Sequence, residues 1–221
     1  TFVFNADDRF AGLWRELAAG RNCRTFGVSR SADVSSPAAA YRVTWQGSRF
    51  QSSFPVLCDR GEIEVRLQLA GEHNRMNALA AIAASLAAGA DLADAQALTE
   101  LAPVGGRLCP LEGPHGSRLI DDSYNANPDS VVAALGVLSA APGRRTLVLG
   151  DLAELGDGAR ELHRQIGERA SAFGIERLLT TGSLSRHAGS GFSGEHHHYA
   201  GHAALAEALM ADLSEEDSLL V

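Results

Sequence analysis

The polar segment from Asp121 to Pro128, with the sequence DDSYNANP, contains the residue types best suited to chemistry. It falls between a predicted strand and a predicted helix, and open parallel sheets bind ligands at the carboxyl ends of their strands. A carboxylate there can accept hydrogen bonds from ribose hydroxyls or help to hold a metal ion. We favour a ligand-binding role for Asp122, because no capping position falls on it. Asn127 is more simply interpreted as the N-cap of a helix that starts at Pro128.

A second segment, from Gly71 to Asn77, places two amides at the start of a predicted helix. Asn74 and Asn77 are three residues apart, so they share a face near the amino end, where free backbone N–H groups and the positive end of the helix dipole also lie. Two amides in that place could recognise the edge of an adenine. The alternative is that Asn74 caps the helix and His73 makes only a local hydrogen bond, and the spacing alone favours this alternative.

Two further loops could bind charged groups. The segment 105–108, with the sequence GGRL, places Arg107 after a flexible glycine pair. Its planar fork suits bidentate phosphate contact, although an arginine after a turn is more often a solvated charge. In the segment 150–156, with the sequence GDLAELG, Asp151 and Glu154 could bind a cationic group or could favour a helix terminus through its dipole.

Metal and redox signals are weak. The run from His196 to His198 places two imidazoles on one side if the chain is extended, an adventitious metal site at most, and we interpret it mainly as a polar loop. The cysteines Cys23, Cys58 and Cys109 lack the spacing of a zinc site or a disulfide framework, which predicts a reducing, cytoplasmic setting. Neither a G-x-G-x-x-G fingerprint nor a G-x-x-x-x-G-K-[ST] phosphate loop is present. We therefore predict no metal site within this chain.

Composition excludes several kinds of chemistry. All 19 basic residues are arginine, so a phosphate-loop lysine, a Schiff base and a carbamylated lysine are ruled out within this chain. The formal net charge of -8 opposes a general affinity for nucleic acid or anionic membranes. No run approaches the roughly 18 apolar residues of a membrane span, and no signal peptide is visible. We expect small-molecule or protein partners, no nucleic acid and no membrane insertion.

The elements that position these residues change character along the chain. From 42 to 69 apolar and polar residues alternate, which predicts antiparallel strands. A helix is predicted from about Asn74 to Ala88, with its stop at Gly89, and another from Leu92 to Leu101, before Pro103. We place a domain boundary here, between domains 1–103 and 104–221.

Short strands and helices alternate in the second predicted domain, which indicates parallel strands joined by right-handed crossovers. The predicted strands are 118–121, 145–149, 177–180 and 219–221. The predicted helices are 128–140, 158–173 and 203–213. The predicted fold class is therefore α/β, with antiparallel strands in the first domain and a parallel sheet in the second.

Taken in order, five motifs resemble those of the Mur ligases. They are Asn5-Ala6-Asp7-Asp8, Gly71-x-His73-Asn74-x-x-Asn77-Ala78, Gly106-Arg107-Leu108, DDSYNANP, and GDLAELG with His163 downstream. The resemblance covers essentially the whole chain, and DDSYNANP with GD-x-AELG is similar to the member that adds D-alanyl-D-alanine rather than a single amino acid. It implies the back part of a P-loop-type central ATPase domain, followed by a Rossmann-like carboxy-terminal domain.

The resemblance also implies a mechanism and residue roles. ATP, with Mg²⁺, would phosphorylate the carboxylate of UDP-N-acetylmuramoyl-tripeptide, and the amine of D-alanyl-D-alanine would attack the acyl phosphate to give an amide, ADP and phosphate. The implied nucleotide-binding residues are Asn74 and Asn77, beside the adenine, and Arg107, Asp122, Tyr124 and Asn127. The weaker candidates for substrate contacts are Asn125, Asp151 and Glu154.

The chain also departs from the family's pattern. The phosphate loop, the magnesium ligands and the UDP-binding domain of family members lie upstream of residues 5–8, and a Lys-Gly-Ser-Arg segment lies beyond Val221. Both ends look cut, so we expect a fragment that is inactive alone, and its catalytic residues stay unassigned. We also expect a cytoplasmic protein that is monomeric. One alternative is a related amide ligase of the folylpolyglutamate or cyanophycin synthetase type, which has different residues around Asp122. The other is a non-catalytic nucleotide-binding module.

Overall fold

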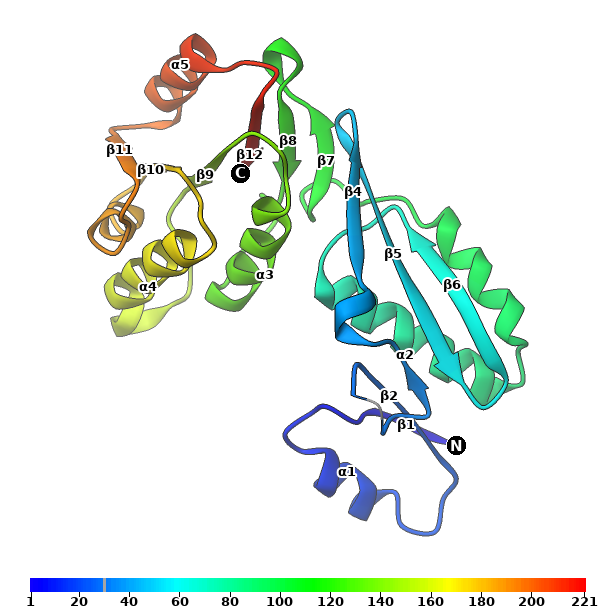
Figure 1. Cartoon of the computed structure of the whole chain (residues 1–221). Coiled ribbons are helices and arrows are strands. Elements are labelled where there is room, and N and C mark those ends of the chain that lie inside the picture. Colours follow the sequence, from blue (N-terminus) through cyan, green and yellow to red (C-terminus); the bar gives the residue numbers. More distant parts are fainter. Residues whose placement is uncertain (30) are drawn as a thin grey trace. The chain divides into compact units, whose positions relative to one another are not determined.

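The computed structural model describes residues 1–29 and 31–221, which form two compact units (Figure 1). The first unit comprises 1–44 and 51–102, and the second comprises 45–50 and 103–221. The structure contains two six-stranded sheets, one built from β1 to β6 and the other from β7 to β12.

The first sheet combines parallel and antiparallel pairing. Its strand order is β1-β2-β3-β5-β4, with β6 paired to β5. β1, β2 and β3 pair in parallel, whereas β5 pairs antiparallel with both β3 and β6. The bounds are β1 Phe2–Asn5, β2 Cys23–Gly27, β3 Val34–Ser35, β4 Arg42–Gln46, β5 Arg49–Cys58 and β6 Gly61–Leu67. The antiparallel strands predicted between 42 and 69 are confirmed.

One long helix packs against this sheet and forms the core together with its strands. The helices of this part are α1 Ala11–Leu17, η1 Ala38–Ala40, α2 Glu72–Ala88 and η2 Leu92–Glu100. The apolar face of α2, with Leu79, Ile82 and Leu86, packs into one buried cluster with Phe54 and Val65. Each such side chain stabilises the fold by about 1.5 to 3 kcal/mol when it is fully buried.

Both helices predicted in the first unit are present, with differences in start and geometry. α2 begins at Glu72 rather than near Asn74, because Gly71 turns the chain at a φ of 102° just before it. It ends at Ala88, and the next residue, Gly89, adopts the left-handed conformation typical of a helix stop, as predicted. η2 is a 3₁₀ helix rather than an α-helix, and Ala95, Leu92 and Leu98 pack it onto the core cluster.

The second sheet has the strand order β11-β10-β9-β12-β8-β7. All neighbours pair in parallel except β7 and β8, which are antiparallel. The bounds are β7 Cys109–Glu112, β8 Arg118–Asp121, β9 Arg144–Leu149, β10 Arg177–Thr181, β11 Glu195–Tyr199 and β12 Asp217–Leu220. The predicted parallel sheet is confirmed, while β7 was not predicted and β11 falls where a polar loop was expected.

The connections place helices on both faces of this sheet. The helices are η3 Pro114–Gly116, α3 Pro128–Ser139, η4 Gly156–Gly158, α4 Ala159–Ala172, η5 Ser185–Ser190 and α5 His202–Asp212. The chain steps from β8 through β9 and β10 to β11, and α5 then returns it to β12 in the middle. Because crossovers are right-handed, α3 and α4 lie on one face and α5 on the other (Figure 1).

Ion pairs close the end of the sheet away from the carboxyl ends of the strands. Arg144 Nε donates to Asp217 Oδ1 at 2.6 Å, and Asp212, at the end of α5, pairs with both Arg144 and Arg177. This network ties α5 to β9, β10 and β12. Within residues 1–29 and 31–221, no helix has both the length and the apolar character needed to cross a membrane.

Candidate active site

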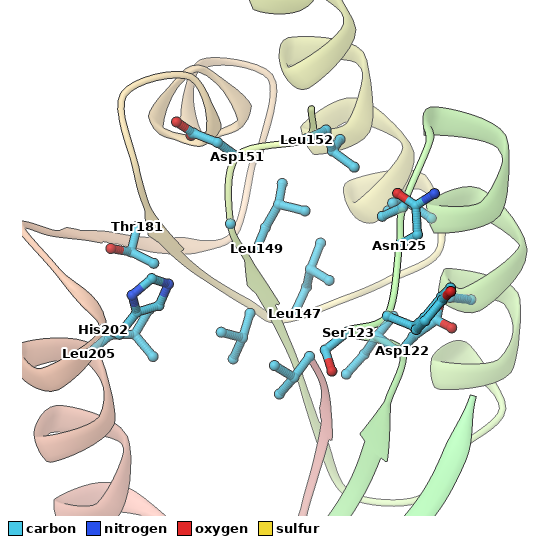
Figure 2. A pocket seen from close by; sticks show the side chains of 18 of the residues that line it. Asp122, Ser123, Asn125, Leu147, Leu149, Asp151, Leu152, Thr181, His202 and Leu205 are labelled. Carbon is cyan, nitrogen blue, oxygen red and sulfur yellow. The ribbon is translucent and has the colours of Figure 1, made fainter. Parts of the chain in front are cut away.

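A cavity of about 660 Å³ lies in the second unit, where β8, β9, β10 and β12 end at their carboxyl side (Figure 2). Leu147, Leu149 and Leu205 make much of its wall apolar, while Asn125 and His202 add polar groups. Ligand cavities in proteins are typically apolar with a few placed polar groups, and open parallel sheets bind ligands at this end. The cavity is therefore the strongest candidate site in the part of the chain that the structure describes.

Two motifs that are separate in sequence are joined beside this cavity. The Tyr124 N–H donates to the Gly106 carbonyl at 3.1 Å, and the Gly106 N–H donates to Asp121 Oδ2 at 2.9 Å. The Leu108 N–H donates to Asp122 Oδ1 at 3.0 Å. These three hydrogen bonds hold the 106–108 segment against the DDSYNANP loop, and we call the pair the motif junction.

Glycine is required at the centre of the motif junction. Gly106 has a φ of 74°, in the left-handed region, and a Cβ atom there would lie 2.9 Å from the Tyr124 Cβ. The close approach lets the two main chains pair. As a result Arg107 projects over Tyr124, with its guanidinium 4.6 Å from the ring centroid.

Asp121 supports this junction, although the sequence singled out its neighbour Asp122. Its carboxylate accepts hydrogen bonds from the Ser123 hydroxyl, the Ser123 N–H and the Gly106 N–H. The Ser123 hydroxyl is the main cause of a lowered Asp121 pKa, and these donors together outweigh the opposing effect of burial. An aspartate two residues before a serine is a local turn signal that could have identified it.

Asn127 fills the cap position that the sequence favoured for it. Its Oδ1 accepts from the Ser130 N–H at 2.9 Å, and the Ser130 hydroxyl closes a reciprocal capping box at the start of α3. The N-cap interpretation is confirmed. Asn125 is exposed and lines the cavity, whereas Asn127 is not among the residues that line it.

Asp151 is the most heavily hydrogen-bonded of the predicted substrate residues. Its carboxylate accepts four hydrogen bonds, from the N–H groups of Ser183, Leu184 and Ser185 and from the Ser183 hydroxyl. Burial favours the neutral form, but these donors outweigh it and hold the pKa of Asp151 below its ordinary value. Since a carboxylate has about four acceptor positions, Asp151 anchors the turn after β10 rather than offering a free oxygen. Glu154 is exposed and does not line the cavity.

Asn74 and Asn77 lie in the first unit, on one face near the amino end of α2. Asn77 is exposed, while Asn74 is half-buried and donates from Nδ2 to the Ala70 carbonyl at 2.8 Å. The alternative that Asn74 caps the helix is wrong, because the helix starts before it and Gly71 occupies the N-cap position. The pairing of the two amides on one face is as the spacing predicted.

The histidine run is a strand, not the polar loop that we predicted, because it pairs in parallel with β10 at the edge of the sheet. His196 Nε2 and His198 Nδ1 both lie within hydrogen-bond distance of Thr180 Oγ1, at 3.1 and 3.0 Å. His197 lies beside Glu195 instead. Among residues 1–29 and 31–221, no group of three or more His, Cys, Asp or Glu side chains could hold a metal ion.

Two family models match this chain, one in each part of it. The model of the Mur ligase middle domain matches residues 1–85, and that of the Mur ligase glutamate ligase domain matches residues 106–221. The chain belongs to the Mur ligase family.

Within that family the chain is similar to proteins of one name. It is 39% identical over 220 residues to the UDP-N-acetylmuramoyl-tripeptide--D-alanyl-D-alanine ligase of Escherichia coli. The aligned region covers 99% of this chain and 47% of that protein. The ligase of the same name from Haemophilus influenzae is 34% identical over 195 residues, or 88% of this chain and 41% of that protein. A crystal structure of MurF from Acinetobacter baumannii aligns with a TM-score of 0.82 at 28% identity, covering 99% of this chain and 47% of that one. The chain thus spans about half the length of these relatives.

Proposed function

We propose that this chain is part of an ATP-dependent ligase that joins D-alanyl-D-alanine to UDP-N-acetylmuramoyl-tripeptide in peptidoglycan synthesis. The observation that carries the proposal is the motif junction, where three hydrogen bonds hold the 106–108 segment and the DDSYNANP loop together beside the cavity. Relatives of that name, at 39% and 34% identity, support the choice of acceptor.

In this proposal the motif junction binds the nucleotide. Arg107 carries a permanent charge in a planar fork that suits phosphate oxygens, and the exposed ring of Tyr124 offers a stacking face beside it. The Asp122 carboxylate would accept a hydrogen bond from a ribose hydroxyl. Asn127 would act through its amide N–H₂, because its Oδ1 belongs to the helix cap. On the first unit, Asn74 and Asn77 would bind the edge of the adenine.

We assign the acceptor dipeptide to the cavity. Its leucine-rich wall suits the methyl groups of two alanines, and Asn125 could hydrogen-bond the dipeptide's polar ends. Glu154 lies on the loop that follows β9, outside the lining of the cavity, and remains a weaker candidate for a contact with the dipeptide's ammonium group before that group loses its proton. Asp151 would contribute by fixing the turn at 183–185, since its oxygens are already used there.

The proposed reaction proceeds in two steps. The γ-phosphoryl group of ATP moves to the tripeptide carboxylate, which gives an acyl phosphate and ADP. The dipeptide amine, after losing a proton, attacks the carbonyl carbon, and the tetrahedral intermediate collapses to the amide with release of phosphate. The positive charge of Arg107 would stabilise the negative charge that accumulates on the transferring phosphoryl oxygens.

Mg²⁺ accompanies ATP in such ligases, but no site for it is offered by the residues that the structure describes, which include no cluster of three metal-binding side chains. We propose that this chain alone is inactive. We further propose a domain boundary between residues 103 and 104 and a cytoplasmic, monomeric protein. The cytoplasm is the compartment that supplies ATP and UDP-linked precursors.

The two alternative functions receive less support. An amide ligase of the folylpolyglutamate or cyanophycin synthetase type is less favoured, because the D-alanyl-D-alanine ligase of Escherichia coli matches 99% of this chain. A non-catalytic nucleotide-binding module would use the same motif junction without turnover. The measurement of turnover therefore separates it from the ligase.

The test is phosphate release from ATP by the full-length protein that contains this chain, with UDP-N-acetylmuramoyl-tripeptide present and D-alanyl-D-alanine added or omitted. We expect release that depends on the dipeptide, together with an amide product of the matching mass. Release that occurs equally with D-alanine or L-glutamate in place of the dipeptide would point to a related amide ligase. Nucleotide binding without release under any of these conditions would favour the binding module.

A further inference from the structure

A buried histidine on α4 holds the loop that forms one wall of the cavity. His163 has no exposed surface, and its ring contacts two main-chain groups. Its Nδ1 lies 2.6 Å from the Ala159 carbonyl oxygen, one turn earlier on α4. Its Nε2 accepts a hydrogen bond from the Leu152 N–H at 3.1 Å. The side chain therefore connects α4 to the loop that follows β9.

These two partners fix the protonation pattern of the ring. A carbonyl oxygen can only accept, so Nδ1 must carry the hydrogen; a backbone N–H can only donate, so Nε2 must be bare. The arrangement defines the neutral Nδ1–H tautomer. Because the Leu152 N–H is buried with its residue, loss of this acceptor would leave it without a partner, and an unsatisfied buried donor is strongly unfavourable.

The loop is held from its other side as well, and it contains a strained residue. Asp151 fastens it to the turn at 183–185, while Glu154 adopts a φ of 60°, in the left-handed region that non-glycine residues rarely occupy. Such a conformation persists where surrounding contacts enforce it. His163 supplies the contact from α4, and Asp151 supplies the contact from the β10 side.

We propose that His163 is a positioning residue for acceptor binding, which acts through the Leu152 N–H to set the wall of the cavity formed by residues 150–153. The inference rests on the proposed function, because it assigns the dipeptide to this cavity. His163 does not touch the substrate. Its role is to keep the loop in the one conformation in which Gly150, Leu152 and Ala153 shape the site.

Two substitutions separate the two hydrogen bonds of the ring. In His163→Asn the amide lies near the position of Nδ1, so the contact with Ala159 can be kept and the acceptor for Leu152 is lost. In His163→Gln the amide oxygen lies near the position of Nε2, so the acceptor for Leu152 is kept. Each variant leaves one polar atom of its new amide group unpaired at the same buried position. The two variants are therefore matched in polarity, and their side chains differ by one methylene group.

The experiment uses the full-length protein and two readouts. The first is hydrogen–deuterium exchange of the peptide that covers residues 147–155, and the second is the KM for D-alanyl-D-alanine beside the KM for ATP. We expect His163→Asn to speed exchange of this peptide and to raise the dipeptide KM at least tenfold, with the ATP KM changed less than threefold. We expect His163→Gln to stay within threefold of the unsubstituted protein on every measure.

Three results would overturn the inference. The two variants could behave alike, which would mean that the Leu152 contact has no special role. Exchange could rise with no change in the dipeptide KM, which would make His163 a purely structural residue. Both KM values could rise together, which would indicate general unfolding. If the unsubstituted protein shows no dipeptide-dependent turnover, the proposed function fails instead. The difference in hydrogen–deuterium exchange between His163→Asn and His163→Gln then decides by itself whether His163 holds the loop.

Discussion

The guanidinium of Arg107 lies 4.6 Å from the centroid of the Tyr124 ring, so a charge and an aromatic face from separate motifs form one exposed surface. Tyr124 is 70% exposed, which is unusual for so large a ring and leaves its other face open to a ligand. The main-chain bond from Tyr124 to Gly106 keeps the two side chains in this relation.

The ring of Tyr124, rather than its hydroxyl, is expected to matter for nucleotide affinity. Cation–π contacts at exposed sites contribute about 0.5 to 1 kcal/mol, so Tyr124→Ala should raise the KM for ATP in the full-length protein by about 2- to 5-fold. Tyr124→Phe keeps the ring and should stay near the unsubstituted value. Equal losses in both variants, in steady-state kinetics, would assign the effect to the hydroxyl instead.

Gly106→Ala should disrupt the motif junction. The added methyl group would lie 2.9 Å from the Tyr124 Cβ at a φ of 74°, so we expect the free energy of unfolding to fall by about 1 to 2 kcal/mol. Gly105→Ala is the matched control, since a Cβ there meets no atom within 4 Å. Urea denaturation of both variants measures the difference. Similar stability of the two would show that the close approach at Gly106 is not required.

Two helix glycines should respond to alanine with opposite signs. A methyl group on Gly167 of α4 would overlap the Ala188 carbonyl oxygen of η5, so Gly167→Ala should destabilise the protein by about 1 to 3 kcal/mol. The nearest atom to a Cβ on Gly136 of α3 is 3.8 Å away, in Phe173. Gly136→Ala should stabilise by up to about 1 kcal/mol through helix propensity. Thermal unfolding that moves in the same direction for both would contradict this packing.

Asp217 should make stability sensitive to acid. Burial alone would raise its pKa, but hydrogen bonds from Arg144 and Ser214 outweigh burial and hold the pKa below its ordinary value of 3.8. A lowered carboxyl pKa stabilises the folded state above the unfolded-state pKa, and this contribution is lost as pH falls through the folded-state pKa. The loss is therefore expected below about pH 4.

Replacing this carboxylate tests that expectation. Asp217→Asn should lower the free energy of unfolding at pH 7 by about 1.5 to 3 kcal/mol, the range for hydrogen bonds to charged groups, and should flatten its decline below pH 4. Asp157→Asn, at an exposed position, serves as the control. Denaturation curves at several pH values provide the measurement. An unchanged acid decline in Asp217→Asn would mean that other carboxyl groups cause it.

Local patterns were sufficient for most helices and strands of the second unit, but they missed β7 and β11 there and the geometry of η2 in the first unit. The strands at 118–121, 145–149 and 177–180 and the helices between them were predictable because short, mainly apolar runs alternate with helical patterns along the chain. β11 was missed because its sequence is polar and contains no apolar run, and its pairing with β10 depends on main-chain hydrogen bonds. η2 was predicted as a helix, but its residue pattern did not distinguish 3₁₀ from α-helical geometry.

The sequence by itself determined which residues could do chemistry: the absence of lysine, the polar loop at 121–128, the cap at Asn127 and the shared face of Asn74 and Asn77 all follow from residue type and short spacing. Only the tertiary structure decided that Arg107 meets Tyr124, that Asp151 is used as an anchor, and that His163 reaches Leu152. The physical reason is the distance along the chain between the interacting residues. Caps and helix faces are set by neighbours within a few residues, whereas these contacts depend on how separate strands and loops are brought together by the sheet.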